Sequence, residues 1–345
     1  RNKMANEMIW TTQSGFLSNA YLDMQYRRQA QPLFKFRNFV SVKSAFGKSS
    51  GESVNWMKAN NLGSYGGKLT ETTTIPEATQ ALAWGTLSVN EYGLAVSHTF
   101  KAETLSKFDV EEILRTGLLD DTAKTIEGEI ENQFFATALK ASGTATGHYA
   151  LATNATVANT NTGGLSVYHI RRIVLDLKKR NVPGYSKLNG DYVGILSVEA
   201  IENIQKDLID VKNAQYSDTG MGKVVINGDV GRILGVRLVE DSWGTRFIYD
   251  STARTATAKE NNSTKTRTGQ ATSWTNASQG GDAYFFGSPT VMEAYVVPEG
   301  IRRKIPGDYG RDKGVAWYGL FGWKIMWGDT TATEADARII HWSSL

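Results

Sequence analysis

Residues 227–242 read Asn-Gly-Asp-Val-Gly-Arg-Ile-Leu-Gly-Val-Arg-Leu-Val-Glu-Asp-Ser, a polar turn followed by an apolar segment. We interpret them, with the residues just before, as a strand at 223–226, a turn at 227–229 and a second strand at 233–240. The glycines at 228, 231 and 235 do not have the G-x-G-x-x-G spacing of a dinucleotide site, and a strand follows where that motif requires a helix. They are therefore expected to be turn glycines.

Helices and strands alternate upstream of this stretch. Ser166 can cap a helix whose apolar residues share one face, and Val182-Pro183-Gly184 ends it. Residues 192–198 are apolar enough for a buried strand, and Ser197 can cap a second amphipathic helix. The inward residues of the two helices are Ile170, Ile173, Val174 and Leu177, then Ile201, Ile204 and Leu208. The order helix, strand, helix, strands predicts an α+β unit with a central sheet.

The strongest helix signal begins at Asp109. Glu112 follows Asp109 at the spacing of a capping box, and apolar residues recur at helical spacing from Val110 to Phe134. We expect this helix to run to about Lys140, a length of about 45 Å at 1.5 Å per residue. Its many carboxylates, among them Glu111 and Asp120, are most simply its solvated face.

The first 95 residues lack the pattern of a compact unit. Residues 1–46 form a polar arm that ends in an alternating segment, with Phe34, Phe36, Val40 and Val42 on one face of an expected strand. Residues 47–95 are rich in Gly, Ser, Asn and Thr between two strand-like segments, which predicts a long, twisted hairpin. The apolar face of such an arm needs a partner, and we expect another copy of the chain to cover it.

Two segments of low complexity interrupt the rest of the chain. Residues 141–164 and 251–281 are rich in Thr, Ala and Asn, so both are expected to be exposed loops, the second inserted in the α+β unit. Strand-like segments follow at 283–286, 291–297 and 315–327. The last alternates aromatic with other large residues, so we expect both of its faces to be largely buried.

Composition excludes several classes of protein. The 38 Lys and Arg nearly balance 35 Asp and Glu, which does not indicate tight nucleic-acid binding. No Cys is present, which excludes disulfides and thiolate metal sites and fits a reducing compartment. The sequence has no apolar run of about 18 residues, and its start lacks the apolar core of a signal peptide. We expect neither membrane insertion nor secretion by that route.

Catalytic motifs are present only out of context. Gly47-Lys48-Ser49-Ser50-Gly51 matches G-x-S-x-G, but no helix start follows it, and Val42 stands where a phosphate loop requires its first Gly. The four histidines are far apart and lack the spacing of a metal site. We therefore expect no catalytic residue, no cofactor and no metal, and the chain is not predicted to be an enzyme.

Contacts between copies of the chain are the sites that the sequence does suggest. Aromatic and apolar side chains are enriched in such interfaces, and the basic cluster Arg302-Arg303-Lys304 could pair with an acidic helix face of a neighbouring subunit. A solvated strand end is the simpler interpretation of that cluster. The candidates are Phe34, Phe36, Val40, Val42, Trp56, Arg302, Arg303 and Lys304.

The segment 166–242 resembles the major capsid proteins of tailed bacteriophages. The resemblance is carried by the glycine-spaced stretch quoted above, by Gly-Ile-Leu-Ser-Val-Glu-Ala-Ile-Glu-Asn-Ile-Gln-Lys-Asp at 194–207, and by Asn-Val-Pro-Gly-Tyr at 181–185. It is sharpest to the podophage family of the N-four type. It implies an α+β chain of the Hong Kong 97-type fold.

The resemblance also implies a division of the chain. Residues 1–46 would be an N-terminal arm, 47–95 the extended loop, 96–165 a peripheral domain with a spine helix, and 166–300 an axial domain with the inserted loop 251–281. Residues 301–345 would return as strands to the peripheral domain. Such a subunit assembles into hexamers and pentamers of an icosahedral shell around double-stranded DNA, with only weak, non-specific DNA contact.

Further partners that the resemblance implies are decoration, scaffolding and portal proteins, and no membrane. The location it implies is the virion capsid, assembled in the bacterial cytoplasm. A secreted carbohydrate-binding or adhesin module is the alternative, because aromatic strands and Thr- and Asn-rich loops also occur there; the start of the chain argues against it. An enzyme would need a convergent polar site that the sequence does not reveal.

Overall fold

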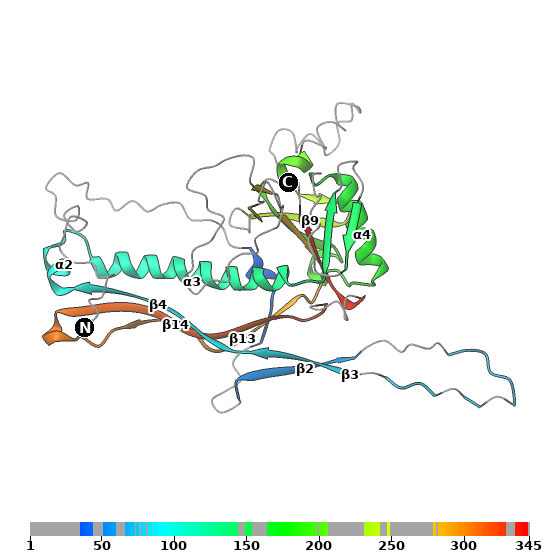
Figure 1. Cartoon of the computed structure of the whole chain (residues 1–345), viewed down its shortest axis with the longest axis horizontal. Coiled ribbons are helices and arrows are strands. Elements are labelled where there is room, and N and C mark those ends of the chain that lie inside the picture. Colours follow the sequence, from blue (N-terminus) through cyan, green and yellow to red (C-terminus); the bar gives the residue numbers. More distant parts are fainter. Residues whose placement is uncertain are drawn as a thin grey trace.

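The structure is a computed structural model and describes residues 35–43, 51–59, 66–72, 74–75, 77–80, 82–143, 149–153, 164–198, 200–205, 231–241, 247–248, 279–280, 282–328 and 335–343. These residues form an elongated layer, a seven-stranded sheet and a projecting hairpin (Figure 1). Phe34, the expected strand at 223–226, the turn at 227–229 and nearly all of 251–281 lie outside the described residues.

The elongated layer is a four-stranded sheet with a long helix lying along it (Figure 1). Its strand order is β1 (Ser41–Lys43), β13 (Val291–Arg303), β14 (Asp312–Ile325) and β4 (Asn90–Thr99). Two of its strands come from the first hundred residues and two from the last fifty-five. The sheet therefore joins segments from the two ends of the sequence, about 200 residues apart.

Helix α3 (Val110–Phe135) begins where the sequence predicts. The Asp109 carboxylate accepts the backbone N–H of Glu112 at 3.2 Å, which satisfies one of the free donors of the first turn. The helix ends at Phe135 and not near Lys140, because Lys140 already belongs to strand β5 (Leu139–Gly143). A short helix α2 (Phe100–Leu105) precedes α3 at the end of the layer that lies far from the seven-stranded sheet, which we call the distal end (Figure 1).

One face of the four-stranded sheet is buried against α3. Leu118, Ile126 and Ile130 of the helix pack with Val315, Trp317 and Phe321 of β14, and the Trp317 indole donates to the Asp121 carboxylate at 2.8 Å. On the opposite face of β14, Ala316, Tyr318, Leu320 and Lys324 are only half-buried. The second face of this strand is therefore less completely buried than the first, although none of its residues is fully exposed.

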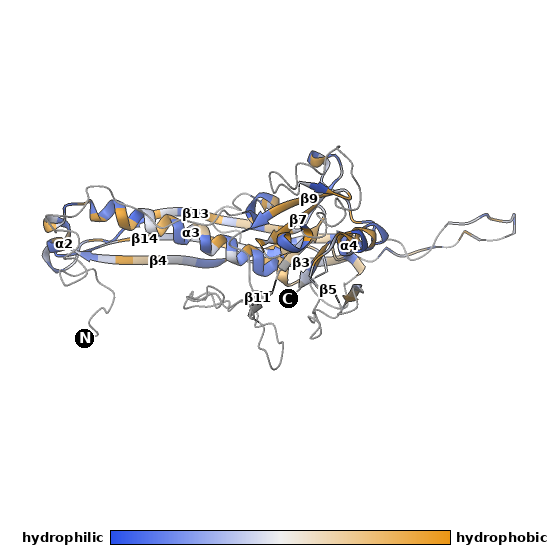
Figure 2. Cartoon of the chain, turned by 90° about the horizontal axis from the view of Figure 1, so that it is seen from above, coloured by the Kyte–Doolittle hydropathy of each residue, from blue (hydrophilic) through white to orange (hydrophobic). Residues whose placement is uncertain are grey.

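The seven-stranded sheet has the order β6 (Tyr149–Ala152), β5, β15 (Ile339–Ser343), β12 (Asp282–Phe286), β7 (Tyr192–Ser197), β9 (Val236–Asp241) and β8 (Arg232–Ile233). The pairs β15–β5 and β7–β9 are parallel, and the other pairs in this sheet are antiparallel. Figure 2 shows β7 mostly in the colours of hydrophobic residues.

Both faces of this sheet are covered, which explains why β7 is continuously apolar. Ala283 and Phe285 face helix α4 (Val167–Lys179) and its core, whereas Tyr284 and Phe286 face the end of α3. Residues 198 and 200–205 are helical, and the Ser197 hydroxyl accepts the N–H of Ala200 at 3.4 Å. The predicted α+β unit with a central sheet is confirmed.

Three details differ from the sequence-based expectations. Residues 139–143 and 149–152 are paired strands of the sheet, so 141–143 and 149–152 are not part of the loop predicted for 141–164, and 139–143 is fully buried. Strand β15 lies in the seven-stranded sheet, so not all of 301–345 returns to the layer with the long helix. The expected strand 233–240 is broken at Leu234 and Gly235, whose φ angles of 52° and 83° make a primed hairpin turn between β8 and β9.

The hairpin consists of β2 (Ser53–Ala59) and β3 (Leu82–Ser88), which are antiparallel as the sequence predicts. The remaining elements are small: the 3-10 turns η1 (Phe36–Phe39), η2 (Ser186–Leu188) and η3 (Asp308–Gly310), and a pair of two-residue strands, β10 (Phe247–Ile248) and β11 (Gln279–Gly280). Within the described residues, no helix has the length and apolar character that a membrane span requires.

Candidate assembly surfaces

The arm segment 35–43 is held by a buried carboxylate. Glu127 of α3 is 2% exposed and accepts the backbone N–H groups of Phe36 and Arg37, the latter at 3.3 Å. Burial raises the pKa of Glu127, and the backbone donors and Arg37 oppose that rise. The carboxylate thus receives the free N–H groups at the start of the η1 turn.

Arg37 ties the same segment to strand β13. Its guanidinium lies 2.9 Å from Glu293, which is fully buried, and 3.2 Å from Glu299. The Phe39 carbonyl accepts hydrogen bonds from the Thr290 hydroxyl at 3.0 Å and from the Tyr185 hydroxyl at 3.4 Å. The segment is therefore fixed by polar contacts to β13 and to Tyr185 and Thr290, which lie just before η2 and β13.

Two aromatic side chains complete this attachment. The Phe36 ring packs edge-on against Phe134 at 5.3 Å and Tyr284 at 5.5 Å between ring centroids. The Phe39 ring meets Phe286 at 5.5 Å and Tyr185 at 5.9 Å. Phe36 is 1% exposed, so it belongs to the core of its own chain.

The expectation that another copy covers Phe36 is therefore wrong, and so is the expected strand at this position. A 3-10 turn forms instead, because Glu127 offers an acceptor for its first N–H groups and the aromatic cluster receives its side chains. Val40 is half-buried against the same cluster. Only Val42, at 53% exposure in the short strand β1, keeps an uncovered apolar side chain.

The inner face of the β2–β3 hairpin is sealed within the chain. Trp56, Leu87 and Val54 pack with Met292 and Ala294 of β13. The Trp56 ring lies on Gly85, where a Cβ atom would be 2.2 Å from the ring. Trp56 is 9% exposed and is thus a core residue and not a free contact, which corrects that candidate.

The outer face of the hairpin is uncovered. Met57 and Trp84 are directly opposite one another in the antiparallel register, and they are 58% and 71% exposed. Leu82, two residues from Trp84 on the same face, is 57% exposed. The sequence analysis missed these three residues, although the alternation around Trp56 places its neighbours on the other face.

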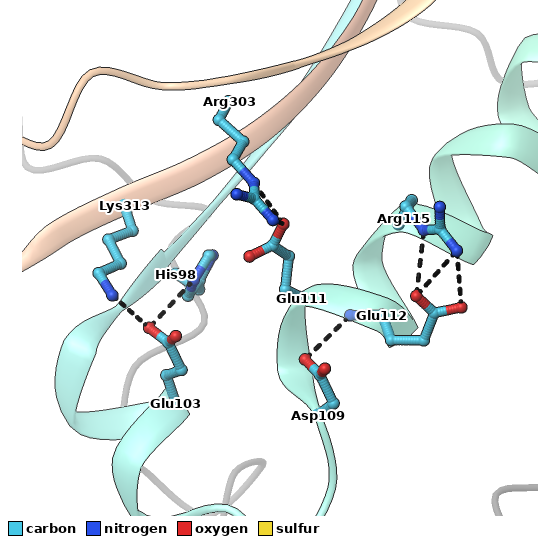
Figure 3. Close-up of polar contacts among 8 residues, drawn as sticks. All are labelled: His98, Glu103, Asp109, Glu111, Glu112, Arg115, Arg303 and Lys313. Carbon is cyan, nitrogen blue, oxygen red and sulfur yellow. Dashed lines mark hydrogen bonds and ion pairs between the residues drawn. The ribbon is translucent and has the colours of Figure 1, made fainter.

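The basic cluster is paired inside the chain, at the distal end of the elongated layer, where Figure 3 shows the contact of Arg303 with Glu111. Arg303 contacts Glu111 of α3 with its Nη2 at 2.5 Å, and the Arg302 guanidinium lies 4.4 Å from the Tyr318 ring centre. Lys304 pairs with Asp312. An acidic helix face does receive Arg303, but it belongs to the same chain, so the predicted contact with a neighbour is wrong for Arg303.

Other polar contacts stabilise this end. Glu103 of α2 lies 2.8 Å from the Lys313 ammonium and 3.8 Å from the buried His98 ring (Figure 3). Ile305 and Tyr309, in the turn between β13 and β14, are 88% and fully exposed. The distal end thus combines several ion pairs with two exposed side chains, Ile305 and Tyr309, in its turn.

Within the described ranges, titratable groups do not converge on a reactive site. Ser166 and His169 lie 2.8 Å apart, but they form the capping box of α4. Burial, with Glu129 nearby, raises the pKa of Tyr92 to about 12. Among the described residues, no three His, Cys, Asp or Glu side chains are placed to hold a metal ion. The geometry is that of a scaffold with exposed faces.

The sequence matches no protein-family model and no curated protein. The fold matches solved phage structures over nearly the whole chain. The capsid structure of cyanophage P-SCSP1u has a TM-score of 0.61 at 11% identity, covering 97% of this chain and 99% of that chain. The acid-stable capsid of Helicobacter pylori bacteriophage KHP30 has 0.60 at 14% identity, covering 99% of each chain.

A third solved structure, from Mycobacterium phage Che8, has a TM-score of 0.60 at 10% identity and covers 92% of this chain and 94% of that chain. Such low identities establish the fold and not a subfamily, so the likeness to the N-four type stays a prediction. The predicted fold class is confirmed: this chain has the α+β fold of phage capsid subunits.

Proposed function

We propose that this chain is the major capsid protein of a tailed bacteriophage, a structural subunit that assembles with copies of itself into the hexamers and pentamers of an icosahedral shell around double-stranded DNA. The observation that carries the proposal is the match over 92–99% of the chain to three phage structures, two of them capsids. The matched part of this chain includes the β2–β3 hairpin, whose outer face no other described part of the chain covers.

In this proposal the elongated layer with α3 is the peripheral domain and the seven-stranded sheet with α4 is the axial domain. The hairpin is the extended loop, and residues 1–46 are the N-terminal arm, of which 35–43 are fixed to their own subunit. The subunit acts in the virion capsid after assembly in the host cytoplasm, and it has no catalytic role. Portal, scaffolding and decoration proteins are its further partners.

The physical argument for self-association rests on the hairpin. Met57, Trp84 and Leu82 form an apolar stripe on a two-stranded ribbon, which is marginal when it stands alone. Burial against a second copy would remove this stripe from water in every subunit, and many modest contacts then add up over a closed shell. A carbohydrate-binding adhesin finds no support in the phage structures that share the fold.

The test is assembly of the purified chain, followed by electron microscopy and sedimentation, with Trp84→Asp as the variant. Wild type is expected to form shells or capsomers, and Trp84→Asp to stay unassembled with an unchanged urea midpoint. Trp84→Phe, which keeps an apolar ring, should assemble. Leu175→Asp on α4 is the matched control, because Leu175 is also an exposed apolar residue, at 40%. A wild-type chain that is monomeric at all concentrations and salts would refute the proposal.

A further inference from the structure

Helix α4 presents an exposed, basic face. Its buried residues Ile170, Ile173 and Leu177 pack into the core of the seven-stranded sheet. The opposite stripe carries four exposed cations, placed as two doublets: Arg171 with Arg172, and Lys178 with Lys179. The doublets lie at i, i+7, so they project from the same side of the helix, two turns apart.

This helix is rich in positive charge. Residues 167–180 contain five basic side chains and one carboxylate, Asp176, which gives a net charge of +4. The whole chain carries +3, so the remaining residues together carry −1. A net charge near zero thus conceals a local positive patch on α4.

Most of these cations have no ion-pair partner in the part of the chain that the structure describes. Lys179 lies 4.0 Å from Asp176, but no described residue forms an ion pair with Arg171, Arg172 or Lys178. Two arginines of the seven-stranded sheet, by contrast, do form ion pairs. Arg232 and Arg237 both pair with the buried Asp191, at 2.7 and 3.4 Å. The face of α4 is therefore a place where an external polyanion would find cations that no described residue pairs.

The spacing of the doublets fits a nucleic-acid duplex. Seven residues of helix span about 10 Å, close to the roughly 12 Å width of the major groove of DNA. Each doublet can therefore meet phosphates on one edge of the groove, where Arg can bind two phosphate oxygens at once. A flexible acidic peptide would not require this fixed separation.

We infer that the exposed face of α4 binds the phosphate backbone of double-stranded DNA without sequence preference. The inference rests on the proposed function and deepens it, since it names the surface through which a shell subunit touches its contents. One such contact is weak, and a shell would repeat it once per subunit. This reconciles a nearly neutral chain with a defined DNA-facing surface.

The experiment is equilibrium binding of a fluorescent 30-base-pair duplex to full-length, unassembled chain over a series of salt concentrations. The variant is Arg171→Gln with Lys178→Gln, one cation from each doublet. Its control is Lys68→Gln with Lys101→Gln, which removes the same charge from two exposed residues on the hairpin side and on α2. For the wild type, the slope of log affinity against log salt is expected to be about −3 to −4.

The α4 variant should bind more weakly and lose roughly one unit of slope per cation removed, whereas the control should retain the wild-type slope. Equal slopes in the two double variants would overturn the inference. So would stronger binding of polyglutamate than of the duplex, which would point to an acidic protein as the occupant.

Shell assembly separates this inference from the proposed function. The α4 variant is expected to form shells as the wild type does, which also shows that it folds. If the variant does not assemble, the single substitution Arg171→Gln gives the same test with about half the change in slope. Shells without a change in DNA binding would refute only the role of α4, whereas failure of the wild type to assemble would refute the proposed function.

Discussion

The arm segment 35–43 and the β2–β3 hairpin look alike in the sequence, as apolar alternation without a compact neighbour, yet they differ in the folded chain. Phe36 in the arm segment is 1% exposed, and Trp84 in the hairpin is 71% exposed. A buried carboxylate, Glu127, accepts the backbone of the first, and nothing described covers the outer face of the second. Apolar alternation without a nearby partner in the sequence therefore does not by itself identify an interface. Whether such a segment is buried in its own chain depends on residues distant in sequence, here Glu127.

The largest expected effect on stability is that of a charge placed at Phe36, in the buried arm segment. Phe36→Asp places a charge among Phe134 and Tyr284, so the free energy of unfolding should fall by about 3–5 kcal/mol or the chain should fail to fold. Val42→Asp, in the same segment but 53% exposed, is the control and should cost less than about 0.5 kcal/mol. Urea unfolding of the unassembled subunit measures both, and similar values for the two variants would contradict the burial of Phe36 in its own core.

A smaller effect sharpens the role of Glu127. Glu127→Ala removes the acceptor of the Phe36 and Arg37 N–H groups and should cost about 1–3 kcal/mol. Glu127→Gln keeps an acceptor oxygen and should cost less. Urea unfolding of both variants tests whether the hydrogen bonds, and not the charge, hold the segment.

The pH dependence of the same residue has a definite sign. Burial raises the pKa of Glu127 above its unfolded value, so its contribution to stability is present below the unfolded pKa and is lost as pH rises through the folded pKa. Glu127→Gln cannot ionise, so its stability relative to wild type should increase between pH 4 and pH 7. The opposite trend would mean that Arg37 and the backbone donors outweigh burial.

The smallest expected effect concerns the distal tip. The Arg303 side chain is 77% exposed, so its ion pair with Glu111 is screened by water. Arg303→Ala should change the free energy of unfolding by no more than about 1 kcal/mol and should lose even that effect in high salt. A larger change, independent of salt, would show that the tip is held mainly by this pair.

Local signals predicted the elements that local contacts determine. Asp109 begins the long helix, Ser166 begins α4, and the two hairpin strands pair where the alternation places them. The end of α3 was misplaced by five residues, because strand β5 begins at Leu139, which pairs with Ile340, about 200 residues away. Strand β6 was missed because its pairing with β5, and not its composition, makes it a strand.

The candidate contacts between copies were predicted less well, again because contacts between residues distant in sequence determine which side chains are buried. Phe36 and Trp56 have apolar side chains, but the residues that they contact are distant in sequence. Phe36 contacts Glu127 and Phe134. Trp56 contacts Gly85 and Met292. Arg303 was correctly given an acidic helix face, but spacing cannot say whether that face belongs to the same chain. Met57 and Trp84 could have been found by continuing the alternation from Trp56.

Single-cysteine footprinting tests the contrast between the two regions most directly, because the chain contains no Cys. Thiol labelling of Met57→Cys should be fast in unassembled subunits and strongly reduced in assembled particles, and Phe36→Cys should be unreactive in both. Equal labelling of Met57→Cys before and after assembly would show that the hairpin face is not covered by a second copy, and rapid labelling of Phe36→Cys in folded subunits would show that the arm segment is not sealed within its own chain.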